Sequence, residues 1–208
     1  MKINIDPKAK ALIFDLDGTL SDSLPVHLET WRRICDKMGC TFDERILTEM
    51  TGMATISFAE RLKREQHLDI DAKEIARMKQ ADFWENIYKV KPNIPVADVV
   101  KRYHNVLPMA VGTGASRKSA ELQLETIHLR DYFDVIVSAD DVENHKPAPD
   151  TFLKCAQMMH VAAGDCIVFE DGELGMQAAR SAGMMLIDVR PYLKASLRTE
   201  KHSGFRTT

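Results

Sequence analysis

The sequence predicts an α/β protein in which a Rossmann-like parallel sheet carries helices on both faces, with an all-helical unit inserted early in the chain. From residue 96 onward, short apolar runs alternate with amphipathic stretches, which is the pattern of a parallel sheet. The first apolar run, 11–14, leads straight into two acids and a glycine. Between residues 24 and 88 the apolar residues follow helical spacing, and no stretch has the pattern of a strand.

Length and composition limit the function classes. The 208 residues suffice for one α/β core and a small additional unit, and 45% hydrophobic with 28% charged residues is typical of a soluble globular protein. A net charge of −3 gives no reason to expect a nucleic acid or membrane partner. Neither a membrane span nor a signal peptide is recognisable, so the cytoplasm is expected. No zinc pattern links the cysteines, which are expected to be reduced thiols: Cys35, Cys40, Cys155 and Cys166.

The run 11–14 predicts a strand buried on both faces, and Asp15 and Asp17 follow it directly. In an open α/β sheet the carboxyl ends of the strands form the ligand-binding edge. Two poorly solvated acids repel each other unless a cation neutralises them, and Mg²⁺ suits such oxygen ligands. Gly18 allows a sharp turn at this point. Taken alone, an ordinary surface turn is the alternative interpretation, whereas a calcium loop is excluded because its glycine would come two residues later.

The inserted unit is expected to consist of helices. Residues 24–38 carry one apolar face, with Pro25 in the first turn and Gly39 at the end. Two prolines in segment 91–95 indicate a return linker, and 21–23 is the outgoing one. Further helices are expected at 44–50, 56–66 and 72–88. The chain is thus divided into a core, 1–22 and 92–208, and a helical cap, 23–91.

The second half is expected to alternate between helix and strand. Its helices are predicted at 96–103, 117–129, 149–159 and 174–182. Its strands are predicted at 108–112, 135–139, 166–169 and 185–189. Residues 191–208 are polar and weakly patterned, which predicts a short helix or a loose tail.

Three further motifs lie near the ends of these strands. Thr113 and Gly114 offer a hydroxyl and open backbone N–H groups, which can bind phosphate oxygens. Lys146 precedes a proline-initiated helix and would supply a cation. Glu170 and Asp171 follow an apolar run, and Asp171 completes a metal site if that run lies beside the first one. The sequence leaves open whether Glu170 ligates the metal directly, through water, or only supports its ligands.

In chain order, these motifs resemble those of the haloacid dehalogenase-like superfamily, and with the cap the resemblance covers nearly the whole chain. The chain is similar to the group of fructose-1-phosphate or 6-phosphogluconate phosphatases and β-phosphoglucomutases. The resemblance implies that Asp15 forms an aspartyl-phosphate, while Asp17 protonates the leaving oxygen and then activates water. It implies Mg²⁺ held by Asp15, the Asp17 carbonyl and Asp171. It also implies that the phosphoryl oxygens of a small sugar or sugar-acid phosphate contact Thr113, Gly114 and Lys146.

Substrate choice is expected to depend on the cap. His27 and Trp31 lie one helical turn apart, and a similar pair occurs in the mutases. Two interpretations stay open, because this pair either contacts substrate or consists of a core tryptophan and an exposed histidine. Thr51 and Gly52 lie in a cap loop where the mutases carry a lysine and an arginine that are absent here. That absence favours hydrolysis over the mutase reaction.

Other activities of the same fold are considered as alternatives. A dehalogenase would lack the second acid, and Asp17 is present. A phosphonatase would need an imine-forming lysine in the cap, and the candidates are Lys37, Lys63 and Lys73. A non-catalytic phosphometabolite-binding protein would be expected to have lost the nucleophile or the metal acids, which are intact. The sequence determines neither the sugar nor the oligomeric state.

Overall fold

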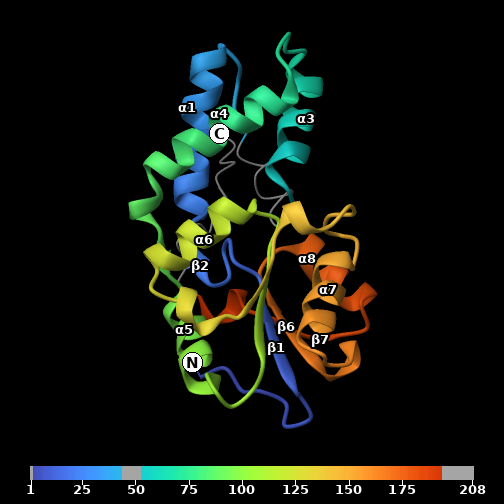
Figure 1. The fold of residues 1–208 in the computed structure, drawn as a ribbon. Helices are drawn as coiled ribbons and strands as arrows, with labels where there is room; N and C mark the ends of the chain where they lie inside the picture. Colours follow the sequence, from blue (N-terminus) through green and yellow to red (C-terminus); the bar gives the residue numbers. More distant parts are fainter. Residues whose placement is uncertain (1, 44–52, 194–208) are drawn as a thin grey trace, which may run out of the picture.

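The computed structural model describes residues 2–43 and 53–193, and its centre is a five-stranded parallel sheet (Figure 1). The strands lie in the order β5-β4-β1-β6-β7, so the first strand of the chain is the central one. Their bounds are β1 Ala11–Phe14, β4 Met109–Gly112, β5 Val135–Val137, β6 Cys166–Glu170 and β7 Met185–Asp188. This confirms the predicted α/β class.

Both faces of the sheet are buried, because alternate side chains of each strand point to opposite sides. Leu12 and Phe14 contribute to the core cluster on one face, which includes apolar residues of α5 (Ile94–Tyr103) and α6 (Arg117–Thr126). Ala11 and Ile13 contribute to the cluster on the other face, with α7 (Asp150–Met158) and α8 (Glu173–Ser181). Burial on both sides explains why these strands are continuous apolar runs.

The predicted helical unit lies at one end of the sheet and has a core of its own (Figure 1). It comprises α1 (Leu24–Met38), α3 (Thr55–Gln66) and α4 (Ala72–Glu85). Pro25 lies in the first turn of α1, and Gly39 ends that helix with a φ of +68°, a left-handed conformation that glycine adopts without strain. Among the described residues, no helix is long and apolar enough to cross a membrane.

Several predicted boundaries were wrong. The helix predicted at 72–88 ends at Glu85, where the Asn86 side chain donates to the Asp82 carbonyl, and a 3₁₀ turn follows. The helix predicted at 117–129 ends at Thr126. The strand predicted at 135–139 ends at Val137, because Ser138 begins a 3₁₀ turn and its hydroxyl donates a hydrogen bond to the Asp141 carboxylate. The helix predicted at 44–50 and most of the tail lie outside the described residues.

The two predicted linkers pair with each other. β2 (Ser21–Asp22) and β3 (Lys91–Pro92) form a short antiparallel ladder, with Ser21 opposite Pro92. The Asn93 side chain donates to the carbonyls of Gly18 and Thr19, at 2.9 and 3.0 Å. The helical unit is therefore joined to the sheet through two adjacent, hydrogen-bonded crossings rather than through separate loops.

All four cysteines are free thiols, as the sequence predicted.

Candidate active site

The site lies where β1 and β6 end side by side. The two strands run parallel with Phe14 opposite Phe169, and the Asp15 N–H donates to the Phe169 carbonyl. Their common edge brings together the carboxylates that follow each strand. One ligand oxygen each from Asp15, Glu170 and Asp171 lies within 4.8 Å of the others. This adjacency, on which the predicted metal site depended, is confirmed.

Gly18 makes room for Asp171. Its φ is +90°, and a Cβ at this position would lie 2.2 Å from Asp171 Oδ2. Glycine therefore satisfies both the turn and the close approach of the carboxylate. The neighbouring Thr19 hydroxyl donates to Asp171 Oδ1 at 2.7 Å and fixes its orientation.

Lys146 is buried, with 1% of its surface exposed, and lies between two acids. Its Nζ donates to Asp15 Oδ1 at 2.7 Å and to Glu170 Oε2 at 2.8 Å. Burial alone would lower the pKa of Lys146, but the two carboxylates outweigh it and raise that pKa, so the ammonium form is held. Glu170 Oε1 accepts from the backbone N–H groups of Asp171 and Gly172. In this arrangement Glu170 supports the lysine and the turn.

The acidic cluster fits a divalent cation. Asp15 Oδ2 is buried and has no hydrogen-bond partner among residues 2–43 and 53–193. Burial, and next the charge of Glu170, raise the pKa of Asp15, while Lys146 opposes the shift. The same two causes raise the pKa of Asp171 to about 7. Three carboxylates face one ammonium here, and a cation with oxygen ligands would neutralise the excess charge and give Asp15 Oδ2 a partner.

Thr113 and Gly114 lie at the end of β4, next to β1, and line the same pocket as Asp15 and Asp17. The Thr113 N–H donates to the Val137 carbonyl, which holds the strand end in place. The Thr113 hydroxyl accepts from the Ala115 N–H at 3.0 Å. This bond between a side chain and the backbone shapes the turn between β4 and α6 at the pocket wall.

Asp17 is held by three donors that all reach Oδ1. They are the Ser23 hydroxyl at 2.6 Å, His27 Nε2 at 2.8 Å and Gln123 Nε2 at 2.9 Å. Burial alone would raise the pKa of Asp17, but the hydrogen bonds from His27, Ser23 and Gln123 to the ionised form outweigh it and lower that pKa. The carboxylate is therefore ionised, and Oδ2 makes none of these three bonds.

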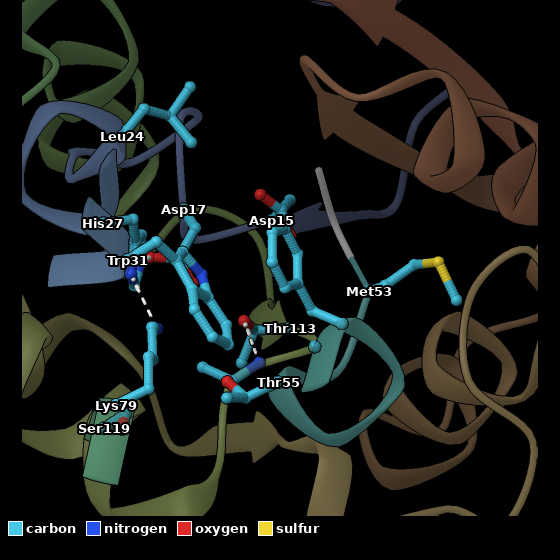
Figure 2. A pocket seen from close by; sticks show the side chains of 13 residues that line it. Asp15, Asp17, Leu24, His27, Trp31, Met53, Thr55, Lys79, Thr113 and Ser119 are labelled. Atoms are coloured by element: carbon cyan, nitrogen blue, oxygen red, sulfur yellow. Dashed lines mark hydrogen bonds and ion pairs between the residues drawn. The ribbon is translucent and has the colours of Figure 1, made fainter. Parts of the chain in front are cut away.

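His27 links Asp17 to a lysine that the sequence analysis missed. Because the Asp17 carboxylate only accepts, His27 Nε2 carries the proton, and Nδ1 accepts from Lys79 Nζ at 2.8 Å (Figure 2). Burial lowers the pKa of Lys79 to about 8, with Asp17 and Asp82 opposing the shift. Burial of the His27 ring, and next the positive charge of Lys79, lower the pKa of His27. Of the two interpretations left open for His27, the exposed histidine was wrong, because only 12% of its side chain is exposed.

Trp31 is both a core residue of the helical unit and part of the pocket wall. Trp31 lines the pocket and is also 2% exposed and stacked on Phe58, with ring centroids 4.1 Å apart. Its predicted core role and its predicted place at the site are thus compatible. Thr51 and Gly52 lie outside the described residues. The three lysines considered for imine chemistry, Lys37, Lys63 and Lys73, do not line this pocket. Lys79 does line it.

Two residues of this network carried a sequence signal that was overlooked. Lys79 occupies the same face of α4 as the buried Ile75 and Phe83. Gln123 lies beside Leu124 on the buried face of α6. A polar residue on the apolar face of an amphipathic helix must find a partner inside the protein, so each position indicated a buried interaction.

Known proteins resemble this chain over most of its length. The family model described as haloacid dehalogenase-like hydrolase matches residues 12–189. The fructose-1-phosphate phosphatase YqaB of Escherichia coli is 43% identical over 179 residues, which is 86% of this chain and 95% of that protein. A phosphorylated carbohydrates phosphatase of Thermotoga maritima is 31% identical over 180 residues, covering 84% and 82%.

A solved structure shows a similar fold over most of the chain. A β-phosphoglucomutase structure from Clostridium difficile superposes with a TM-score of 0.77 at 25% identity, covering 86% of this chain and 84% of that one. The family match includes Asp15, Thr113, Lys146 and Asp171, which the fold brings to one edge of the sheet. The chain therefore belongs to the haloacid dehalogenase-like hydrolase family.

Proposed function

We propose that this hydrolase is a Mg²⁺-dependent phosphatase that releases phosphate from small phosphorylated sugars, of the fructose 1-phosphate or 6-phosphogluconate type. The observation that carries the proposal is the buried Asp15, which pairs with Lys146 on one oxygen and finds no hydrogen-bond partner for the other in the described part of the chain. Such a carboxylate can act as nucleophile and as metal ligand at once. The 43% identity to a fructose-1-phosphate phosphatase supports the substrate class.

In the first half-reaction, an Asp15 oxygen attacks phosphorus and the bond from phosphorus to the sugar oxygen breaks. Asp17 gives its proton to that oxygen, which requires Asp17 to be protonated when substrate is bound. Lys146, Thr113 and the Gly114 backbone hold the phosphoryl oxygens for in-line transfer. In the second half-reaction, water attacks phosphorus and passes a proton to Asp17, while the bond from phosphorus to the Asp15 oxygen breaks, which releases inorganic phosphate and restores the Asp15 carboxylate. The lowered pKa of Asp17 favours the ionised form, which this second step needs.

Mg²⁺ would be held by Asp15, Asp171 and the backbone carbonyl of Asp17, and would neutralise charge on the phosphoryl group. Glu170, whose two oxygens accept from Lys146 and from backbone N–H groups, would support these ligands. Segment 23–91 would act as the cap over this pocket, with His27, Trp31 and Lys79 facing the sugar.

The test is phosphate release from a panel of sugar and sugar-acid phosphates, with and without Mg²⁺, for the wild type and Asp15→Asn. We expect metal-dependent release that vanishes in the variant, while thermal melting shows that the variant is folded. Release that persists in Asp15→Asn would overturn the nucleophile.

A second assay separates the alternatives. The superposition on a β-phosphoglucomutase structure makes the mutase reaction the second candidate. Conversion of β-glucose 1-phosphate to glucose 6-phosphate without net phosphate release would establish the mutase reaction. Binding of these compounds with neither release nor conversion would indicate a non-catalytic role.

A further inference from the structure

Gln123 is a completely buried side chain of α6 that the chemistry above does not use. Its Nε2 donates to Asp17 Oδ1 at 2.9 Å, and its Oε1 accepts from the Ser21 hydroxyl, also at 2.9 Å. The direction of the amide follows from chemistry, because a carboxylate accepts and cannot donate. Both ends of the amide are therefore paired, one with Asp17 and the other with the short β2 strand.

The donors to Asp17 come from two parts of the molecule. Ser23 and His27 belong to the beginning of α1 and thus to the helical unit. Gln123 comes from α6, which packs against the sheet through Ala120 and Leu124. Among the described residues, it is the donor that ties the Asp17 carboxylate to the sheet unit.

The same helix is also joined to the helical unit. Ser119, four residues before Gln123 and so on the same face of α6, accepts from the Trp84 indole N–H of α4 at 2.9 Å. The Lys118 ammonium lies 3.8 Å from the centroid of the Trp84 ring. The position of α6 relative to α4 is thus fixed one helical turn away from the contact with Asp17.

We propose that Gln123 is a positioning residue for Asp17. By holding Oδ1 from the sheet side, it leaves Oδ2 facing the pocket, where a proton is exchanged with the leaving sugar oxygen. The inference rests on the proposed function, since it takes the proton transfer by Asp17 from it. Gln123 does not line the pocket, so its loss changes proton transfer rather than binding of the phosphoryl group.

The test compares two phosphate esters that differ in their need for an acid. A sugar phosphate has an alkoxide leaving group and needs a proton, whereas p-nitrophenyl phosphate releases a weakly basic phenolate and does not. For Gln123→Met we expect kcat/KM to fall by roughly 10- to 100-fold with the sugar phosphate and by less than about threefold with the aryl ester. Because kcat/KM covers steps up to the first phosphoryl transfer, the difference isolates protonation of the leaving group.

Two further variants complete the design. Gln123→Leu keeps a branched side chain without the amide donor and should show the same selective loss; it decides the outcome if Gln123→Met melts below the assay temperature. The matched control is Gln157→Met on the exposed face of α7, which should leave both rates unchanged.

The outcomes separate the two proposals. Equal losses with both esters, or no loss with either, would overturn the positioning role while leaving the phosphatase intact. A wild type that hydrolyses neither ester would refute the proposed function, and the role of Gln123 with it.

Discussion

Two glycines decide how closely the carboxylates of the site can approach the backbone. Gly18 leaves space for Asp171, and Gly175 in α8 leaves space for Glu170. A Cβ at Gly175 would lie 1.9 Å from Glu170 Oε2, the atom that accepts from Lys146. The buried ion pair therefore depends on the absence of a methyl group on a neighbouring helix.

Gly175→Ala should destabilise the protein although alanine is the better helix former. The gain in helix propensity is at most about 1 kcal/mol, whereas displacing Glu170 breaks a buried ion pair, so we expect a net loss of about 2 to 4 kcal/mol. Phosphatase activity should fall at least about tenfold, because Lys146 loses one of its two anchors. Denaturant unfolding and phosphate release measure the two effects.

Gly164→Ala is the matched control, since the nearest atom to its added Cβ is the Gly183 carbonyl oxygen at 3.9 Å. We expect its stability to stay within about 0.5 kcal/mol of the wild type. If Gly175→Ala behaved like this control, the close packing of Glu170 against α8 would be refuted.

At the scale of elements, the contact between α4 and α6 joins the helical unit to the sheet unit. Trp84 donates to Ser119 across this contact, and Ser119 also lines the pocket. Phe83, next to Trp84, is 1% exposed and belongs to the core cluster of the sheet rather than to that of the helical unit. The end of α4 is thus held by apolar packing and by one oriented hydrogen bond.

A double-mutant cycle with Trp84→Phe and Ser119→Ala should measure that bond. Phenylalanine keeps an aromatic ring, although a smaller one, and removes the indole N–H, so we expect a coupling free energy of about 0.5 to 1.5 kcal/mol in urea unfolding. Additivity within about 0.3 kcal/mol would mean that the hydrogen bond contributes nothing to the joint. Lys118→Met serves as the control, because it removes the cation over the Trp84 ring and leaves the hydrogen bond.

At the scale of the whole molecule, the acidic cluster links stability to pH and to metal. The pKa of Asp171 is about 7 in the metal-free folded protein, raised by burial and by the charge of Glu170 from an ordinary value of 3.8. Between these values the folded protein binds more protons than the unfolded chain, so this group makes folding less favourable as pH rises, by up to about 4 kcal/mol. A bound cation would remove that penalty, because it favours the ionised carboxylate.

We therefore expect Mg²⁺ to raise the melting temperature more at pH 8 than at pH 5.5, where a proton on Asp171 competes with the metal. Melting curves in chelator and in excess Mg²⁺ at both pH values test this. Asp171→Asn should show a much smaller metal effect at both. An equal rise at the two pH values in the wild type would contradict the assignment of Asp171 as a ligand.

The fold was predictable wherever one local pattern decided the structure. Continuous apolar runs identified β1 and β6, and apolar spacing with Pro25 and Gly39 identified α1. The ends of α4 and β5 were not predicted, because side-chain caps at Asn86 and Ser138 determine them. The pairing of β2 with β3 was missed because two-residue strands have no periodicity.

The sequence by itself determined the α/β class, the order of the acidic motifs and of those proposed to bind phosphate, and the presence of a helical insertion, since each depends on residues close together in the chain. Tertiary structure decided which residues meet at the site. It directed both oxygens of Glu170 to Lys146 and the turn, and it brought Lys79 and Gln123 to the network around Asp17. These contacts join segments up to 106 positions apart, and their distances follow from packing, which no local pattern encodes.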